Sequence, residues 1–180
     1  MNKLISVQTE NDILPQYRNT PISKLLEYHN LDRKFETYQK AELLVGMCMD
    51  NRKHLHMPDN FAFIIRSGGA NLRFSEFKVS YAIAVGQVKH IVLIGHNNCG
   101  MVNLVSRKNE FIAGLVESAG WTEKRAEEHF LQYAPMFEIH SETDFILSEA
   151  KRLREVYPTI VFAPMFYKVD DNKLYFIEED

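Results

Sequence analysis

Short apolar runs of strand length recur along this chain, and segments with helical periodicity separate them. The runs at 43–49, 61–65 and 90–95 are each bounded by charged or turn-forming residues. Continuous apolar runs of this length are typical of strands buried on both faces, as in parallel sheets. The alternation predicts an α/β fold with a mostly parallel central sheet and helices on both faces.

Four segments have the apolar spacing of helices, and they lie at about 21–40, 77–88, 101–133 and 141–157. The last segment opens with a capping-box-like pattern, Ser-Glu-Thr-Asp, and Pro158 ends it. Residues 1–18 have no clear period, so we expect an arm or a loop there.

Two further strands are expected at 159–169 and 173–177, joined by the turn-forming residues 170–172 (Asp-Asp-Asn). A connection this short predicts an antiparallel C-terminal hairpin. Pro164 lies in the first of these strands and has no backbone N–H to donate. We therefore expect that strand to lie at an edge of the sheet or to contain a bulge.

The composition is that of an ordinary soluble protein. The 180 residues are 46% apolar and 25% charged, with a formal net charge of −3. These values predict one domain, 1–180, without a basic surface for nucleic acid. No apolar run is long enough to cross a membrane, and the N-terminus turns polar too soon for a secretory signal. We therefore expect a cytoplasmic protein in which Cys48 and Cys99 are thiols.

A polar cluster follows each of the three apolar runs. The clusters are 48–52 (Cys-Met-Asp-Asn-Arg), 66–69 (Arg-Ser-Gly-Gly) and 96–100 (His-Asn-Asn-Cys-Gly). In open parallel sheets, ligands bind at the carboxyl ends of strands, where the strand order reverses. The clusters are therefore expected to meet at one site.

The first and third clusters contain the donors of a zinc site. His96 and Cys99 are three residues apart in a turn, and Cys48 ends another strand. Two thiolates and an imidazole suit tetrahedral zinc, whereas magnesium and calcium take oxygen ligands. Three protein ligands leave one position open, as in catalytic zinc sites. The alternative is that both cysteines are small buried hydrophobes and His96 is a loop histidine.

Asp50 and Arg52 are expected beside this metal. In an extended chain their side chains point the same way as that of Cys48. A guanidinium can fix a carboxylate in one orientation, so that the carboxylate orients a zinc-bound water. Two alternatives are that Asp50 swings in as a fourth ligand, or that the pair is a solvated ion pair of little energetic value.

These motifs resemble those of the β-class carbonic anhydrases. The family pattern is Cys-x-Asp-x-Arg, then an Arg-Asn-Ala-Gly-like segment, then His-x-x-Cys-Gly, and the three clusters follow it in order. The match is good over residues 40–105 and weak from there to the C-terminal strands. The chain length and the Cys-Met-Asp form resemble the short, compact members of the family.

The resemblance implies zinc held by Cys48, His96 and Cys99, with Asp50 and Arg52 as the catalytic pair. The implied reaction is the reversible hydration of carbon dioxide to bicarbonate and a proton by zinc-bound hydroxide. Zinc lowers the pKa of its bound water to about 7, a value established for carbonic anhydrase and adopted from it. The resemblance also implies a homodimer or a dimer of dimers, with residues 1–40 as an N-terminal helical arm and the active site near the subunit interface.

The chain departs from the family pattern at several positions. Residues 66–69 differ from Arg-Asn-Ala-Gly, and Asn97 stands where Ser or Thr is common. These departures leave the identity of the substrate undecided. One alternative is hydrolysis of carbonyl sulfide or carbon disulfide, and another is zinc binding without catalysis. Arg66 and Gly69 are expected to line the substrate pocket, although Arg66 could instead hold a loop carbonyl and Gly69 could permit a tight turn.

Two histidines close to the first cluster have open roles. His54 and His56 could carry a proton to solvent, because histidine titrates near neutral pH. The alternative is that both lie on a solvated loop. A further alternative is His56 as a fourth zinc ligand.

Overall fold

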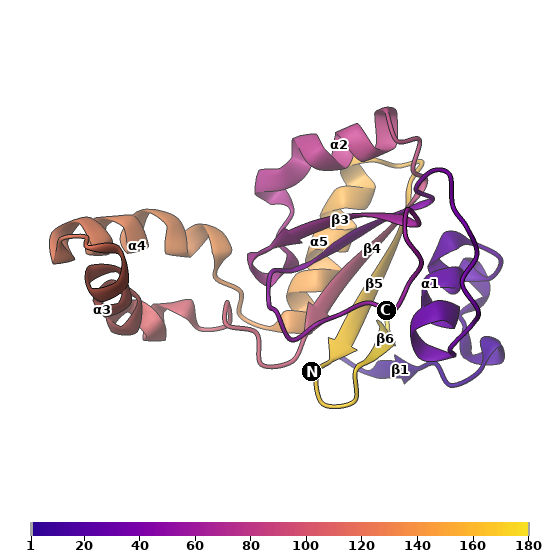
Figure 1. The fold of residues 1–180 in the computed structure, drawn as a ribbon, viewed down its shortest axis with the longest axis horizontal. Coiled ribbons are helices and arrows are strands. Elements are labelled where there is room, and N and C mark those ends of the chain that lie inside the picture. Colours follow the sequence, from indigo (N-terminus) through magenta and orange to yellow (C-terminus); the bar gives the residue numbers. More distant parts are fainter. Residues whose placement is uncertain (1, 180) are drawn as a thin grey trace.

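The centre of this protein is a mixed sheet in which four neighbouring strands run parallel. The structure is a computed structural model and describes residues 2–179. Within them the strand order is β1-β6-β5-β4-β2-β3, where β1 is the short strand Leu4–Ser6 (Figure 1). The parallel strands are β2 (Leu43–Cys48), β3 (Ala62–Ser67), β4 (His90–His96) and β5 (Val161–Lys168). Strand β6 (Lys173–Ile177) pairs antiparallel with β5, so the predicted sheet and C-terminal hairpin are confirmed.

Helices cover both faces of the sheet, as predicted. Helix α1 (Pro21–Asn30) lies on one face, and α2 (Glu76–Ala84) and α5 (Glu142–Val156) lie on the other (Figure 1). Helices α3 (Lys108–Ala119) and α4 (Glu123–Phe137) form a hairpin that projects away from the sheet. None of the helices in residues 2–179 combines the length and apolar composition of a membrane span.

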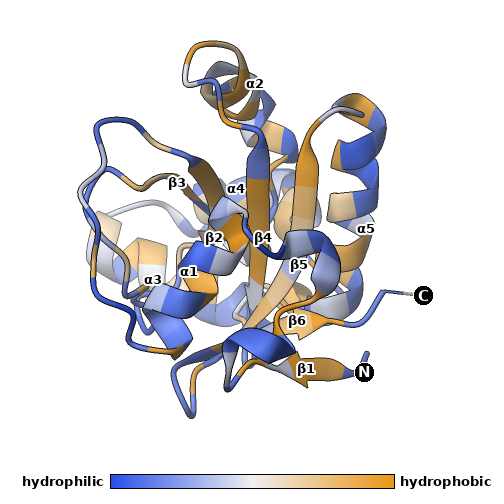
Figure 2. Cartoon of the chain, turned by 90° about the vertical axis from the view of Figure 1, so that its right-hand side faces the viewer, coloured by the Kyte–Doolittle hydropathy of each residue, from blue (hydrophilic) through white to orange (hydrophobic). Residues whose placement is uncertain are grey.

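The strands bury both of their faces because successive side chains point in opposite directions. In β2, Val45 and Met47 pack on the side of α1, whereas Leu44 packs on the side of α2 and α5. In β4, Ile94 lies on the α1 side and Leu93 on the other. The apolar colour along these strands in Figure 2 reflects this double burial.

Three elements differ from the sequence prediction. Leu4–Ser6 forms a short strand, β1, at the sheet edge, because it pairs antiparallel with β6. The first helix ends at Asn30 and is shorter than expected. The expected helical segment 101–133 is divided into two helices, because Gly120 ends α3 at φ +67° and the Thr122 side chain caps α4.

The prediction that Pro164 places its strand at an edge or a bulge is wrong, because β5 lies between β4 and β6. Val161 donates its N–H to Lys89, on the β4 side. Since N–H groups alternate along a strand, the nitrogen of Pro164 faces the β6 side. The pairing with β6 covers only Met165 to Lys168, so no ladder bond needs the missing donor.

Candidate metal centre

The carboxyl ends of β2 and β4 place two of the predicted ligands side by side. The chain passes from β2 to β3 on one side and then to β4 on the other, so the strand order reverses between β2 and β4. Cys48 is the last residue of β2 and His96 the last of β4. The turn after β4 returns Cys99 toward both residues, and the three side chains converge in the buried interior.

The spacing of the three donors fits a tetrahedral metal. One ligand atom from each of Cys48, His96 and Cys99 lies within 4.8 Å of the others. The two Sγ atoms are 3.9 Å apart. Two sulfurs on a tetrahedral zinc, with Zn–S near 2.3 Å, would be separated by about 3.8 Å, whereas a disulfide needs about 2.05 Å. The sulfurs therefore have the separation of two ligands of one ion.

The His96 ring presents the correct nitrogen to this centre. Its Nδ1 lies 2.9 Å from the Asn97 carbonyl, which can only accept, so Nδ1 carries the proton. Nε2 then has a free lone pair. It is buried and has no hydrogen-bond partner among residues 2–179. A buried nitrogen of this kind is costly unless something binds it, and a metal would do so.

The two thiols are electrostatically coupled. The hydrogen bond from Cys99 lowers the pKa of Cys48, and the same contact raises the pKa of Cys99. Without a metal, the two sulfurs therefore share one proton, with Cys48 as the thiolate and Cys99 as the thiol. A divalent cation would take the place of that proton and leave both sulfurs as thiolates.

Asp50 is held beside the centre by Arg52. The Arg52 Nε donates to Asp50 Oδ1 at 3.0 Å, Nη2 donates to Oδ2 at 2.6 Å, and the Arg52 backbone N–H adds a bond of 2.9 Å. These hydrogen bonds hold the pKa of the Asp50 carboxyl well below its usual range. The carboxylate is also close to the candidate ligands, with Oδ2 3.9 Å from His96 Nε2.

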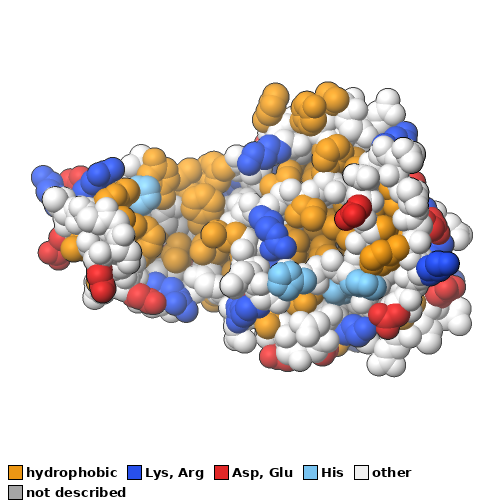
Figure 3. All heavy atoms as spheres, viewed as in Figure 1, with side chains coloured by type: hydrophobic (Ala, Val, Ile, Leu, Met, Phe, Trp, Pro, Cys, Tyr) orange, Lys and Arg blue, Asp and Glu red, His pale blue; other side chains and the backbone are white. Residues whose placement is uncertain are grey.

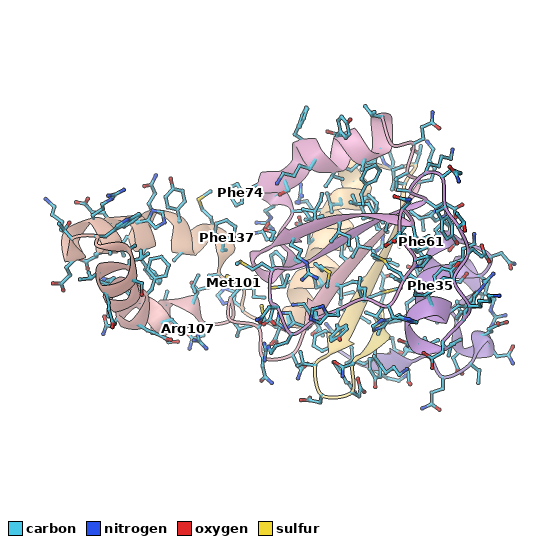
Figure 4. All side chains as sticks on the ribbon, viewed as in Figure 1. Phe35, Phe61, Phe74, Met101, Arg107 and Phe137 are labelled. Carbon is cyan, nitrogen blue, oxygen red and sulfur yellow. The ribbon has the colours of Figure 1, made fainter. Side chains whose placement is uncertain are left out.

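Two cavities adjoin the centre. Asp50 and Arg52 line an open groove of about 770 Å³ that continues along α3 past Arg107. An apolar cavity of about 300 Å³ lies beside it, lined by Met49, Met101, Phe130, Tyr133 and Phe137 among others. Figure 4 shows Met101 and Phe137 at the junction between the α3–α4 hairpin and the sheet. Asp50 connects the groove with the centre, and the apolar cavity lies beside that groove, but none of the three candidate ligands lines either one.

A family model described as carbonic anhydrase matches residues 45–160. This match covers more than half of the chain and includes the whole candidate centre. The chain belongs to the β-carbonic anhydrase family. A comparison with curated protein sequences found no significant match.

Solved structures share the fold of this β-carbonic anhydrase at low identity. The β-carbonic anhydrase isoform I of Trichomonas vaginalis has a TM-score of 0.64 at 17% identity, over 82% of this chain and 90% of that one. A carbonic anhydrase from Streptococcus mutans has a TM-score of 0.59 at 15% identity, over 92% and 100%. A carbon disulfide hydrolase in its apo form has a TM-score of 0.56 at 20% identity, over 78% and 80%.

In this β-carbonic anhydrase, Arg66 and Gly69 have structural contacts. Arg66 donates to the carbonyls of Cys48 and Asp50, both at 3.3 Å, and of Lys53 at 3.2 Å. It thereby holds the loop that carries Asp50 and Arg52. Gly69 adopts φ +62°, and a Cβ there would lie 3.3 Å from carbons of Ile139. Glycine is therefore needed for the turn itself.

The two histidines of the following loop differ in their contacts. His56 is turned toward α1, where its Nδ1 lies 2.9 Å from the Tyr28 carbonyl and its backbone N–H donates to His29 Nδ1. Its donors are not in the group that converges at the centre. His54 is exposed.

Sequence reasoning missed two residues of this site. The Asn97 side chain accepts from the Val169 N–H at 2.8 Å and donates to Asp170 at 3.0 Å, so it ties the turn after β4 to the C-terminal hairpin. The second missed residue is Lys53, which is fully buried. A lysine next to an arginine in a polar cluster is expected to be exposed, so nothing in the sequence indicated its burial. For Asn97, the sequence did carry a signal, because asparagine stands where the family commonly has Ser or Thr.

Proposed function

We propose that this protein catalyses the zinc-dependent, reversible hydration of carbon dioxide to bicarbonate and a proton. The observation that carries the proposal is the convergence of three soft donors beside a carboxylate that an arginine fixes. Membership of the β-carbonic anhydrase family supports the same reaction.

Zinc is the proposed cofactor, held by the Sγ atoms of Cys48 and Cys99 and by His96 Nε2. The free Nε2 and the 3.9 Å sulfur separation support this ligand set. When bound, zinc supplies a Lewis acid that ionises water near neutral pH, as is established for carbonic anhydrase. Two thiolates balance the charge of the ion, so the centre has no net charge before water ionises.

Asp50 is the proposed orienting base of the reaction. Because its carboxylate stays ionised, it can only accept a hydrogen bond, and it therefore selects a hydroxide or water that donates to it. The attacking oxygen would then turn a lone pair toward carbon dioxide. Arg52 fixes the orientation of the carboxylate, and its bond of 3.0 Å to the Asn98 carbonyl anchors the pair to the turn that carries Cys99.

The cavities suit the substrate and product. Carbon dioxide has no net dipole and would partition into the apolar cavity beside Met49 and Met101. Bicarbonate would leave through the open groove, where Arg52 and Arg107 are paired with Asp50 and Glu110. Contact of substrate with Arg66 or Gly69, proton transfer by His54 or His56, and a cytoplasmic location stay predictions.

The test is zinc content combined with a stopped-flow pH-indicator assay of carbon dioxide hydration. We expect about one zinc per chain and a hydration rate well above that of buffer. A protein that holds zinc but gives no acceleration between pH 6 and 9 would support the non-catalytic alternative. A protein without zinc would contradict the ligand set.

A second candidate is hydrolysis of carbon disulfide or carbonyl sulfide at the same centre. The apolar cavity of about 300 Å³ suits both molecules, because they are linear and uncharged as carbon dioxide is. One protein of similar fold is a carbon disulfide hydrolase. Sulfide release from either compound, at a rate above that of carbon dioxide hydration, would replace the first proposal.

A homodimer is the proposed assembly, with a dimer of dimers as the larger alternative. Strand β3 lies at the sheet edge, and its outer side has no strand partner within residues 2–179. Beside it, large apolar side chains are exposed on β3 and α2, and we call this surface the β3–α2 face: Phe63, Ile64, Phe74, Phe77, Tyr81 and Val85. Exposed apolar groups gather above the sheet on the side of α2 in Figure 3. A second copy would remove this surface from water.

A further inference from the structure

Lys53 is buried in a way that lysines seldom are. Its side chain has 0% exposure. Its Nζ is one of three buried side-chain polar atoms in residues 2–179 without a hydrogen-bond partner, the others belonging to His29 and His96. An ammonium without partners is among the most costly groups to bury, so packing alone does not account for a lysine at this position.

The surroundings of Lys53 connect it to the candidate centre. Four charged or titratable groups affect the pKa of Lys53 through their charge. They are Cys48 at the end of β2, Asp50 on the same loop as Lys53, Cys99 after β4, and Arg66 on β3. Three of these four belong to the centre, and all three are negative when ionised. Burial lowers the pKa of Lys53, while the three acidic groups oppose that shift.

The backbone at Lys53 is held by Arg66. Arg66 donates to the Lys53 carbonyl and also to the carbonyls of Cys48 and Asp50. The Arg66 guanidinium therefore binds the segment 48–53 at its start, its middle and its end. The buried Lys53 side chain therefore extends from backbone that is tied to Cys48 and Asp50.

The charges of the centre suggest a role for this lysine. With zinc bound, the ion and two thiolates sum to zero, and so do Asp50 and Arg52. Formation of hydroxide, or of bicarbonate after its attack on carbon dioxide, adds one negative charge that nothing in this set balances. Lys53 is the only buried lysine or arginine within residues 2–179, whereas Arg66, the other cation that contacts this loop, is exposed.

We propose that Lys53 is the built-in counter-charge for a monoanion at the metal centre, hydroxide before the reaction and bicarbonate after it. The inference rests on the proposed function. It assigns Lys53 a positioning role through charge, without contact with the reacting atoms.

The test compares Lys53→Met, which keeps length and removes charge, with Lys53→Arg, which keeps charge. Lys89→Met is the control for loss of an exposed lysine. Each variant is prepared with zinc for hydration rates against pH, and with cobalt for absorption spectra against pH and against added azide. Azide is a monoanion that does not react, so its affinity reports the charge effect without catalysis.

For Lys53→Met we expect the pH midpoints of the rate and of the cobalt spectrum to rise together by about one unit, and azide affinity to fall about tenfold. Thermal stability should hold or increase, because an unpartnered charge is lost. Lys53→Arg and Lys89→Met should keep the wild-type midpoints. If Lys53→Met does not fold, Lys53→Gln replaces it.

Unchanged midpoints and azide affinity in Lys53→Met would overturn the counter-charge role and leave the proposed function intact. Loss of stability without a shift of either midpoint would have the same meaning, since Lys53 would then be purely structural. If the wild-type protein binds no metal, the proposed function fails first, and this inference falls with it.

Discussion

Arg52 donates hydrogen bonds to both carboxylate oxygens of Asp50, from Nε to Oδ1 and from Nη2 to Oδ2. This fork-to-fork pair fixes the carboxylate beside the candidate ligands, with Oδ2 3.9 Å from His96 Nε2, while Asp50 stays outside the group of atoms that converge within 4.8 Å. The proposed chemistry depends on this orientation, because a carboxylate that moved onto the metal would close the position needed for water.

Asp50→Asn should keep zinc and lose activity. The amide can donate a hydrogen bond as well as accept one, so it no longer selects the orientation of the attacking oxygen. We expect a fall in hydration rate of about 10²–10³-fold, with zinc content unchanged, measured by stopped flow and metal analysis. Equal rates in wild type and variant would contradict a catalytic role for the pair.

Cys99→Ser should lose zinc. A serine hydroxyl does not ionise at neutral pH and is a poor substitute for a thiolate. We expect near-zero zinc after dialysis and loss of activity, with the fold retained by circular dichroism. Asn103→Ser, just beyond the same turn and outside the ligand set, is the control. Full zinc occupancy in Cys99→Ser would exclude Cys99 as a ligand.

Stability should fall as the pH falls, because of His29. Burial is the main cause that lowers its pKa from 6.5 to about 4. The unfolded chain therefore binds a proton between these values while the folded chain does not, so this stabilisation is complete above pH 6.5 and is lost toward pH 4. From pH 7 to pH 5 the loss is about 2 kcal/mol.

The measurement is urea unfolding at pH 7 and pH 5 for the wild type and His29→Asn. The asparagine oxygen can still accept the bond that His56 donates, but it does not titrate. We expect the pH-dependent loss to be smaller by about 2 kcal/mol in the variant. The same loss in both proteins would show that other groups cause it.

Arg152→Met should destabilise the fold. Glu149 on α5 has 0% exposure, and Arg152 donates to both of its oxygens at 2.9 Å while also reaching Glu76 on α2 at 3.1 Å. Removal of the arginine leaves a buried carboxylate with Arg73 at 3.5 Å, at a cost of about 3 kcal/mol by urea unfolding. Glu149→Leu added to Arg152→Met should recover most of this loss. Additive losses in the double variant would contradict the argument.

Phe77→Asp should weaken the proposed dimer. Phe77 is 81% exposed at the centre of the β3–α2 face, so a charge there costs the isolated chain little. We expect a smaller mass by light scattering than for the wild type. Val156→Asp, at the end of α5 and also exposed, should keep the wild-type mass. A wild-type monomer, or a Phe77→Asp dimer, would place the interface elsewhere or exclude it.

Much of the fold follows from patterns local to the sequence. The apolar runs predicted β2, β3 and β4, because strands buried on both faces need no polar side. Gly120 followed by Thr122 was a readable sign of a helix end and a helix start, which the continuous apolar spacing of 101–133 obscured. The site was accessible in the same way, since parallel strands that end in polar clusters must present them at one edge.

Other features were decided by tertiary structure alone. Pro164 is tolerated inside the sheet because its nitrogen faces the side where β6 no longer pairs, and only strand order reveals that. Lys53 is buried in the loop after β2, whose carbonyls Arg66 of the neighbouring strand β3 binds. Side-chain periodicity depends on neighbours along the chain, so the sequence by itself determined the strands, helices and metal-ligand motif. Burial and strand order depend on contacts between distant segments, so the environment of each charge emerged only from the folded structure.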